Sequence, residues 1–239
     1  MNIKLPTLKV GFMSLILMFI VSSCASISYS PKISLDVSNK TINKTVQIDK
    51  LVDITESSYT KNPFGGLSVT NKEALQNSLD LEVTNAIVTD FSTNGVFKQV
   101  SRRVDNPDII IKGEIRKFYG ISKLNTFFKI SYFGSIAILT VAVVAQSTPL
   151  LIASAATIAP LYLGVPISKN TSEVEITLKA YNSKGDLLGT YSASVIDDNS
   201  SNMYKNKALA LPSMTNRVFS KTIMEIRNQI IEDYDKLSK

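Results

Sequence analysis

Cys24 is the only cysteine of the 239-residue chain, and the residues before it give it a defined chemical context. The chain starts with a short segment that contains the basic residues Lys4 and Lys9, followed by the apolar run 10–20. The small residues Ser22 and Ser23 then precede the cysteine. A basic start, an apolar run and small residues before a cleavage point are the parts of a secretory signal peptide. The sequence therefore predicts that the chain is exported.

The run Val21-Ser22-Ser23-Cys24 resembles the lipoprotein box of bacterial envelope lipoproteins. This resemblance implies that residues 1–23 are a lipoprotein signal peptide, that the Cys24 thiol receives a diacylglyceryl group, and that its new amine is acylated. Each buried methylene of an acyl chain contributes roughly 0.8 kcal/mol, so several chains hold a protein on a bilayer where one does not. An uncleaved signal anchor and an ordinary buried cysteine are the alternatives.

The chain contains no histidine, which removes the commonest general base and metal ligand together with every Ser-His or Cys-His arrangement. The acidic pairs Asp197-Asp198 and Glu232-Asp233 are adjacent in sequence, so their side chains point in different directions on a strand or helix. Gly65-Gly66 is typical of a turn and not of a phosphate-binding loop. We expect no catalytic site, no metal and no cofactor. An exported enzyme that uses carboxylates is the remote alternative.

The charge balance argues against nucleic acid as a partner. Loss of Lys4 and Lys9 from the 26 basic residues leaves 24 against 20 acidic residues, a net charge of +4. The excess is scattered, and the longest basic block is Arg102-Arg103. A nucleic-acid footprint needs a basic face with base-reading or stacking residues. With a single cysteine the chain forms no internal disulfide, so its fold depends on the core alone.

Periodicity predicts the first half of the folded part. Residues 24–44, rich in Ser, Asn, Lys and Thr, are expected to be a tether, and the alternation in 45–55 predicts a strand followed by a loop over 56–69. Residues 70–73 have the form of a capping box for a helix that ends at Asn94-Gly95. The apolar stripe of this helix is Leu75, Leu79, Val83, Ile87 and Phe91.

Further strands are predicted at 96–100, 108–118, 173–181 and 187–195, and residues 182–185 are typical of a hairpin turn between the last two. A second amphipathic helix is predicted at about 213–236. Its apolar stripe is Phe219, Ile223, Ile226, Ile230 and Tyr234.

Two amphipathic helices must pack their stripes on one sheet, so the order predicts an α+β fold, a two-layer α/β sandwich over 45–239. The order resembles the amino-terminal domain of the translocation protein TolB, the curli-secretion channel lipoprotein, penicillin-binding-protein activator lipoproteins and auxiliary lipoproteins of ABC transporters. The residues that match are 94–100 and 105–115, and the likeness extends over 45–120 and 172–236. Those families share no catalytic residue, so the resemblance implies the fold alone.

The insertion 130–168 contains no charged residue, and neither of its halves has a polar face. As a helix, 130–147 would span roughly 27 Å, just short of a hydrocarbon core of about 30 Å. The pattern favours a membrane-embedded helical hairpin that turns near 146–149, with Tyr132 and Tyr162 at the interface. A buried helix pair or a subunit contact is the second reading. An inserted β-hairpin is the last, because the segment lacks apolar/polar alternation.

The predicted function follows from these features. We expect a non-enzymatic, lipid-anchored envelope protein that serves as an accessory subunit of a transport or assembly complex. The alternative is an oligomeric secretion-channel lipoprotein whose insertion enters the membrane. The expected partners are the membrane, through acylated Cys24, and envelope proteins or further copies of the chain. The predicted membrane or partner contacts are Tyr132, Phe133, Ile136, Leu139, Val143, Leu150, Leu151 and Tyr162.

The residue after the cysteine bears on location. It is Ala25, whereas aspartate at this place retains lipoproteins in the inner membrane of enteric bacteria. That family rule favours the outer membrane. A helical hairpin would instead tend to be kept in the inner membrane. Because the insertion is barely long enough to span, we expect the outer membrane.

Overall fold

A computed structural model of the chain describes residues 40–55, 66–70, 75, 77–202, 204–205 and 211–238. The described strands form one seven-stranded sheet in the order β4-β1-β5-β6-β7, with β2 and β3 also paired to β5. The strands are β1 (Ile42–Ile48), β2 (Val52–Asp53), β3 (Gly66–Thr70), β4 (Phe97–Ser101), β5 (Ile109–Leu124), β6 (Ser168–Asn182) and β7 (Leu187–Ser201). The helices are α2 (Leu79–Thr93), α3 (Thr126–Val144), α4 (Thr148–Tyr162), α5 (Leu211–Glu232) and α6 (Tyr234–Leu237).

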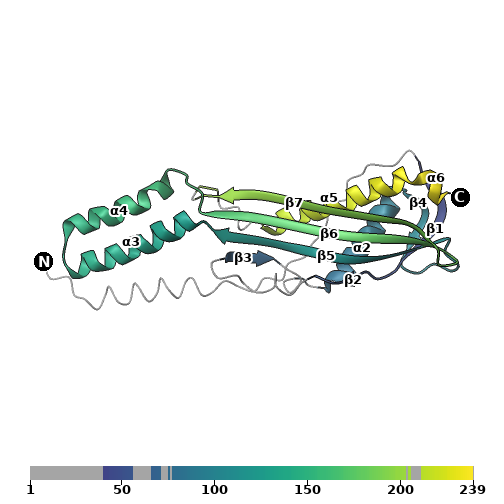
Figure 1. Ribbon diagram of the computed structural model, residues 1–239, viewed down its shortest axis with the longest axis horizontal. Coiled ribbons are helices and arrows are strands. Elements are labelled where there is room, and N and C mark those ends of the chain that lie inside the picture. The colour runs from purple at the N-terminus through teal and green to yellow at the C-terminus, as the bar shows by residue number, and fades with distance from the viewer. Residues whose placement is uncertain are drawn as a thin grey trace.

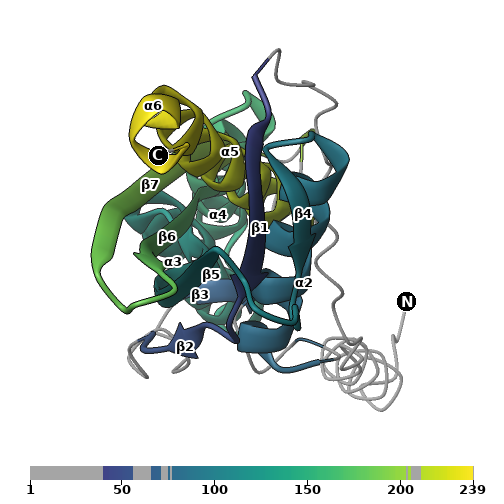
Figure 2. The same cartoon turned by 90° about the vertical axis from the view of Figure 1, so that its right-hand side faces the viewer.

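The sheet is mixed and strongly elongated. β1 is parallel to both β4 and β5, whereas β5, β6 and β7 form an antiparallel ribbon. With 15 or 16 residues and a rise of roughly 3.3 Å per residue, each strand of the ribbon is roughly 50 Å long. The ribbon runs along the long axis of the molecule, and α3 and α4 project beyond its end (Figure 1). Figure 2, turned by 90°, shows α5 beside β7 and α2 beside β4.

The two-layer α/β sandwich predicted from the sequence is confirmed. α2 and α5 pack against the sheet in one continuous core. An edge-to-face contact joins Phe118 of β5 to Phe219 of α5, with ring centroids 5.3 Å apart. Both predicted helical stripes face this core, and their fully buried members are Leu79, Val83, Ile87, Phe91, Phe219, Ile223, Ile226 and Ile230.

A buried ion pair joins the two helices. Nη1 of Arg227 in α5 lies 3.2 Å from both carboxylate oxygens of Asp90 in α2, and the Arg227 side chain is only 1% exposed. Burial raises the pKa of Asp90, and the charge of Arg227 opposes this shift. The pair therefore fixes how α2 and α5 meet above the sheet.

The ends of elements confirm two predictions made from turn residues. Gly95 follows α2 with φ +63°, and the amide of Val96 donates to the carbonyl of Phe91, which closes the helix as the Asn94-Gly95 signal predicted. Gly185, with φ +90°, closes the predicted turn between β6 and β7.

The structure corrects the predicted first strand and loop. The strand predicted at 45–55 is divided into β1 and β2, and β1 begins at Ile42. Part of the predicted loop forms β3, which pairs antiparallel with β5, so Thr70 lies opposite Gly120 at the end of a strand. The helix starts only at Leu79, after Ser78. Residues 71–74, which carry the rest of the predicted capping box, lie outside the described residues.

The strands that flank the insertion are longer than predicted. β5 continues to Leu124, and β6 already begins at Ser168. A bulge between Ile115 and Lys117 shifts the alternation by one residue, so that Phe118 faces the core. After Phe118 the inward side chains of β5 and β6 include Ser122, Ser172 and Asn170, so the extension of the strands shows no apolar alternation in the sequence.

Removing one charge of the buried pair tests its role. Asp90→Ala is expected to lower the free energy of unfolding by about 3–5 kcal/mol, because the buried guanidinium loses its carboxylate. The double variant Asp90→Leu/Arg227→Met removes both charges and is expected to recover most of that loss. Urea denaturation of residues 24–239 with Cys24→Ser, which keep every described element, measures both variants. A double variant that is less stable than the single one would contradict this account.

Candidate functional site: the apolar hairpin and its neck

The insertion forms a helical hairpin of α3 and α4, called the hairpin below, as the sequence predicted. α3 begins after Asn125, whose side-chain oxygen accepts a hydrogen bond from the amide of Phe127 at 2.9 Å. At the other end Gln146 adopts φ +51°. The amides of Gln146 and Ser147 donate back to the carbonyls of Val143 and Ala142, which is the pattern of a Schellman motif. The Schellman motif thereby satisfies the amides of Gln146 and Ser147 at the tip.

Small and polar side chains line the contact between the two helices. Ser131, Ser135 and Ala142 of α3 are buried, as is Ser154 of α4, and Leu161 near the end of α4 is the one large apolar side chain of the two helices that is fully buried. The hydroxyl of Ser154 donates to the carbonyl of Ser135 at 3.3 Å. A helix pair in water places its large apolar residues at the contact. In membranes, by contrast, helix contacts are enriched in small residues.

Large apolar side chains cover the outside of the hairpin. Of the predicted contact residues, Tyr132, Phe133, Ile136, Leu139, Val143, Leu151 and Tyr162 are exposed, whereas Leu150 is half-buried. Phe133 and Val143 are 59% and 55% exposed. The sequence analysis did not single out further exposed side chains of the hairpin and its ends, namely Phe127, Ile130, Val141, Val144, Ile152 and Leu163. A segment that is apolar on all sides gives no signal of which face turns inward.

α3 has the length and the apolar composition of a membrane-crossing helix. It has 19 residues and a mean hydropathy of 1.9, and only 17% of it is buried within the described chain. This low burial argues against a helix enclosed in the core of its own chain. α4 is also apolar, although it is shorter, with 15 residues.

Backbone and side-chain hydrogen bonds tie the hairpin to the ends of the long strands, a region called the neck below (residues 123–129, 163–169, 201–202 and 204–205). The amide of Asn125 donates to the carbonyl of Ile167 at 2.8 Å, and Ile167 donates to Ser201 at 2.7 Å. The hydroxyl of Tyr204 donates to the carbonyl of Tyr162 at 2.5 Å. The neck therefore continues the ladder of the sheet into the base of the hairpin.

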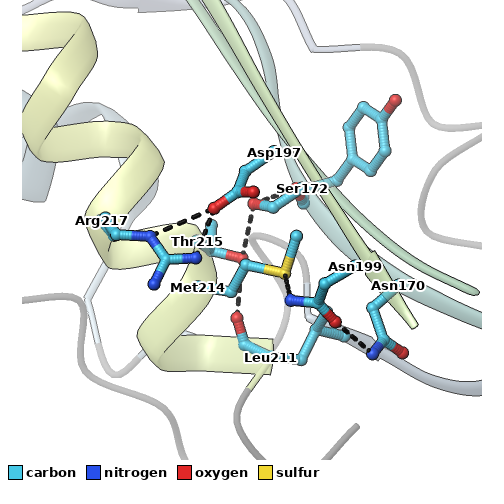
Figure 3. A network of polar contacts seen from close by, with 9 residues as sticks. Asn170, Ser172, Asp197, Asn199, Leu211, Met214, Thr215 and Arg217 are labelled. Carbon is cyan, nitrogen blue, oxygen red and sulfur yellow. Dashed lines mark hydrogen bonds and ion pairs between the residues drawn. The ribbon is translucent and has the colours of Figure 1, made fainter. Parts of the chain in front are cut away.

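A polar network closes the core on the side of the neck (Figure 3). Ser172 Oγ lies 2.9 Å from Thr215 Oγ1, and Asn170 Nδ2 donates to Asn199 Oδ1 at 2.7 Å. Asn170 and Ser172 are fully buried although they are polar. Satisfied polar groups of this kind fix a unique packing. The network marks the place where the apolar core ends and the polar half of the ribbon begins.

The acidic pair Asp197-Asp198 is divided between the two faces of the sheet, as the sequence analysis expected. Asp197 faces α5 and pairs with the guanidinium of Arg217 (Figure 3). Asp198 accepts a hydrogen bond from Thr171 and pairs with Lys169 Nζ at 2.9 Å, and these contacts lower its pKa. Both carboxylates therefore serve structural pairs.

The helix-free face of the sheet carries a cluster of charged residues. Lys117 Nζ lies 2.8 Å from Glu173 and 3.2 Å from Glu175, and Tyr119 donates to Glu173 at 2.5 Å. Hydrogen bonds to Glu173 and then Glu175 raise the pKa of Lys117, so its amine stays protonated and is not a nucleophile. Within the described ranges, no three His, Cys, Asp or Glu side chains are grouped as a metal site.

The same face has an open pocket of about 160 Å³ near β2. It is lined by Val52, Lys112, Gly113, Glu114, Thr177, Lys179 and Tyr181. Lys112 lies 5.9 Å from the centre of the Tyr181 ring, which places the ammonium over an aromatic face. The pocket holds no pair of groups arranged for acid–base chemistry.

Four lysines gather at the neck. Lys123 of β5 and Lys169 of β6 are direct partners across the ladder. Lys129 lies in the first turns of α3, and Lys205 follows β7 in a turn closed by hydrogen bonds with Asn202. Only Lys169 has an ion-pair partner among the described residues, namely Asp198. These four lysines come from four separate segments of the chain, so their grouping could not be predicted from the sequence.

No known family profile and no curated protein matches the sequence. Among solved structures, the chain is similar to protein XCC0632 of Xanthomonas campestris, from the DUF330 family, with 9% identity, a TM-score of 0.50, and coverage of 87% of this chain and 94% of that one. At this identity the likeness shows the fold alone.

Two other solved structures are more distant. The PelC dodecamer of Paraburkholderia phytofirmans has 8% identity, a TM-score of 0.33, and coverage of 80% and 92% of the two chains. A minor lipoprotein of Acinetobacter baumannii has 9% identity, a TM-score of 0.36, and coverage of 78% and 93%. Neither likeness is close enough to extend the comparison beyond the fold that XCC0632 already shows.

Removing the hairpin tests whether the body folds without it. Residues 126–166 are replaced by Asn-Gly-Ser between Asn125 and Ile167, whose backbones are already hydrogen-bonded. Because α3 and α4 pack on each other, the free energy of unfolding is expected to stay within about 1 kcal/mol of the parent chain, the value of one lost hydrogen bond. Urea denaturation measures it. A loss of several kcal/mol would show that the hairpin is part of the folding core.

Proposed function

We propose that this protein is a non-enzymatic envelope lipoprotein that holds a bilayer in two ways, through acylated Cys24 and through insertion of the hairpin. The observation that carries the proposal is the arrangement of the hairpin, which buries serines and turns its large apolar side chains outward. Such a surface is unfavourable in water. Burial of each exposed Phe, Leu, Ile or Val side chain contributes roughly 1.5–3 kcal/mol.

Insertion end-on is the orientation that suits this surface. A helix that lies along the membrane surface keeps a strongly polar face toward water, and neither α3 nor α4 has one. At 1.5 Å per residue α3 is roughly 28 Å long, close to a hydrocarbon thickness of about 30 Å. Within the hydrocarbon every backbone donor needs a partner inside the protein, and the Schellman motif supplies partners for the amides of Gln146 and Ser147 at the tip.

The body then stands at the membrane as a rigid accessory domain. Residues 1–23 are the signal peptide, 24–44 the tether and 45–239 the folded domain, and the protein serves a transport or assembly complex of the envelope through contacts with other proteins. Ala25 after the cysteine favours the outer membrane. We prefer this role to an oligomeric channel, because the hairpin has no polar side with which several copies could line a pore.

Vesicle flotation tests insertion without the acyl anchor. Residues 24–239 with Cys24→Ser are expected to float with neutral phosphatidylcholine vesicles. Leu139→Asp in α3 places a carboxylate at the centre of the apolar segment. Its transfer into the bilayer costs about 2.5–3.5 kcal/mol, so the variant is expected to partition onto vesicles about 100-fold less than the parent chain. Ile196→Asp is the matched control, since Ile196 is 58% exposed on the body. Equal partitioning of the two variants would refute insertion.

The acyl anchor has a separate test. Mass spectrometry of the protein purified from membranes of its native host is expected to find an N-terminal peptide that begins at Cys24 and carries acyl chains. It is also expected to find no peptide from residues 1–23. An unmodified peptide that contains Cys24 together with its preceding residues would contradict the lipoprotein assignment and leave insertion of the hairpin untouched.

A further inference from the structure

Positive charge is concentrated at the hairpin end of the molecule. No acidic residue occurs between Glu114 and Glu173, and none between Asp198 and Glu225. Near the four lysines of the neck, Asp198 pairs with Lys169, and the neighbouring Asp197 pairs with Arg217. The described residues of the neck carry a net charge of +4, and Asp198 next to the neck reduces the local charge to +3.

Two of these lysines lie opposite each other in the sheet, and only Lys169 is paired with an acid among the described residues. Lys123 and Lys169 lie directly opposite in the ladder, where Cβ atoms are about 4.5–5.5 Å apart and like charges are unfavourable. Both side chains are exposed, as is Lys205. An arrangement of this kind costs stability in the isolated protein, and a bound anion would relieve it.

The apolar hairpin places the lysines at a particular depth. Lys123 lies just before the hairpin, and Lys129 lies in its first turns. The uncharged segment begins directly after Lys129 and ends directly before Lys169. Tyr132 and Tyr162 lie at the same end of the hairpin, and Tyr204 is hydrogen-bonded to the backbone of Tyr162. Tyrosines favour the boundary between headgroups and hydrocarbon, and lysines extend their ammonium groups to that level.

We propose that the neck binds the phosphate headgroups of anionic phospholipids in the bilayer that the hairpin enters, through Lys123, Lys129 and Lys205. The inference rests on the proposed insertion and adds to it the class of lipid. Lys169 completes the positive surface while it stays paired with Asp198. Each lysine near an anionic membrane strengthens binding about fivefold at low ionic strength.

The experiment compares vesicles of two compositions with the chain 24–239, Cys24→Ser. One set contains phosphatidylcholine alone, and the other contains phosphatidylcholine with phosphatidylglycerol. The variant Lys123→Gln/Lys129→Gln/Lys205→Gln is expected to lose about 100-fold in partitioning onto the anionic vesicles and to match the parent chain on the neutral ones. A matched control, Lys98→Gln/Lys184→Gln/Lys221→Gln, removes the same charge from exposed sites elsewhere on the body.

The outcomes separate the two proposals. Retained binding of the neck variant to anionic vesicles, or an equal loss in the control, would overturn the headgroup site while neutral vesicles still report insertion. Salt-sensitive binding of the parent chain to anionic vesicles alone, lost in the neck variant, would support the headgroup site and overturn insertion. If the parent chain binds neither vesicle, both proposals fail. Inorganic phosphate and chloride at equal ionic strength are expected to compete equally, and stronger competition by phosphate would assign the site to free phosphate.

Discussion

The apolar outer surface of the α3–α4 hairpin is the constraint on which the rest of the structure depends. Within the described chain, nothing covers side chains such as Phe133, Val143 and Ile152, and the helix contact is occupied by small residues instead. The hydrophobic effect therefore gives the two helices little reason to associate in water. In a bilayer the same surface is solvated by lipid, and the close contact of small residues becomes the favourable arrangement.

The sheet connects this hairpin to a body whose large apolar side chains are buried in a core. The half of the ribbon under α2 and α5 has an apolar inner face, with Ile115, Phe118 and Ile176 buried. From Gly120 onward the inner face is built from Ser122, Asn170 and Ser172. The ladder of β5 and β6 continues without a break to the hairpin, so the body and its apolar end are joined by backbone hydrogen bonds and not by a loose linker.

Much of the fold could be predicted because its signals are periodic. Local sequence patterns predict the apolar stripes of α2 and α5 and the turn at Gly185. The uncharged segment between Lys129 and Lys169 likewise predicts the hairpin without any distant partner. β3 could not be predicted, since its pairing with β5 depends on a partner more than fifty residues away. The polar half of the ribbon lacks apolar alternation, and a helix that is apolar on every side does not reveal that Ser135 and Ser154 face each other. The neck lysines become a group only once the ladder places Lys123 opposite Lys169.

The depth of the hairpin in a bilayer is the most direct test of its insertion. Single cysteines are placed at Phe133, Leu139 and Val144 in the chain 24–239 that carries Cys24→Ser, and each is labelled with a nitroxide. Power saturation by oxygen and by a water-soluble nickel complex then gives the depth of each label in vesicles. Because α3 is about as long as the hydrocarbon is thick, insertion end-on predicts that the label at Leu139 is the deepest. The labels at Phe133 and Val144 are expected to lie nearer to the two interfaces but still within the hydrocarbon. Equal access of the nickel complex to all three labels would contradict the account.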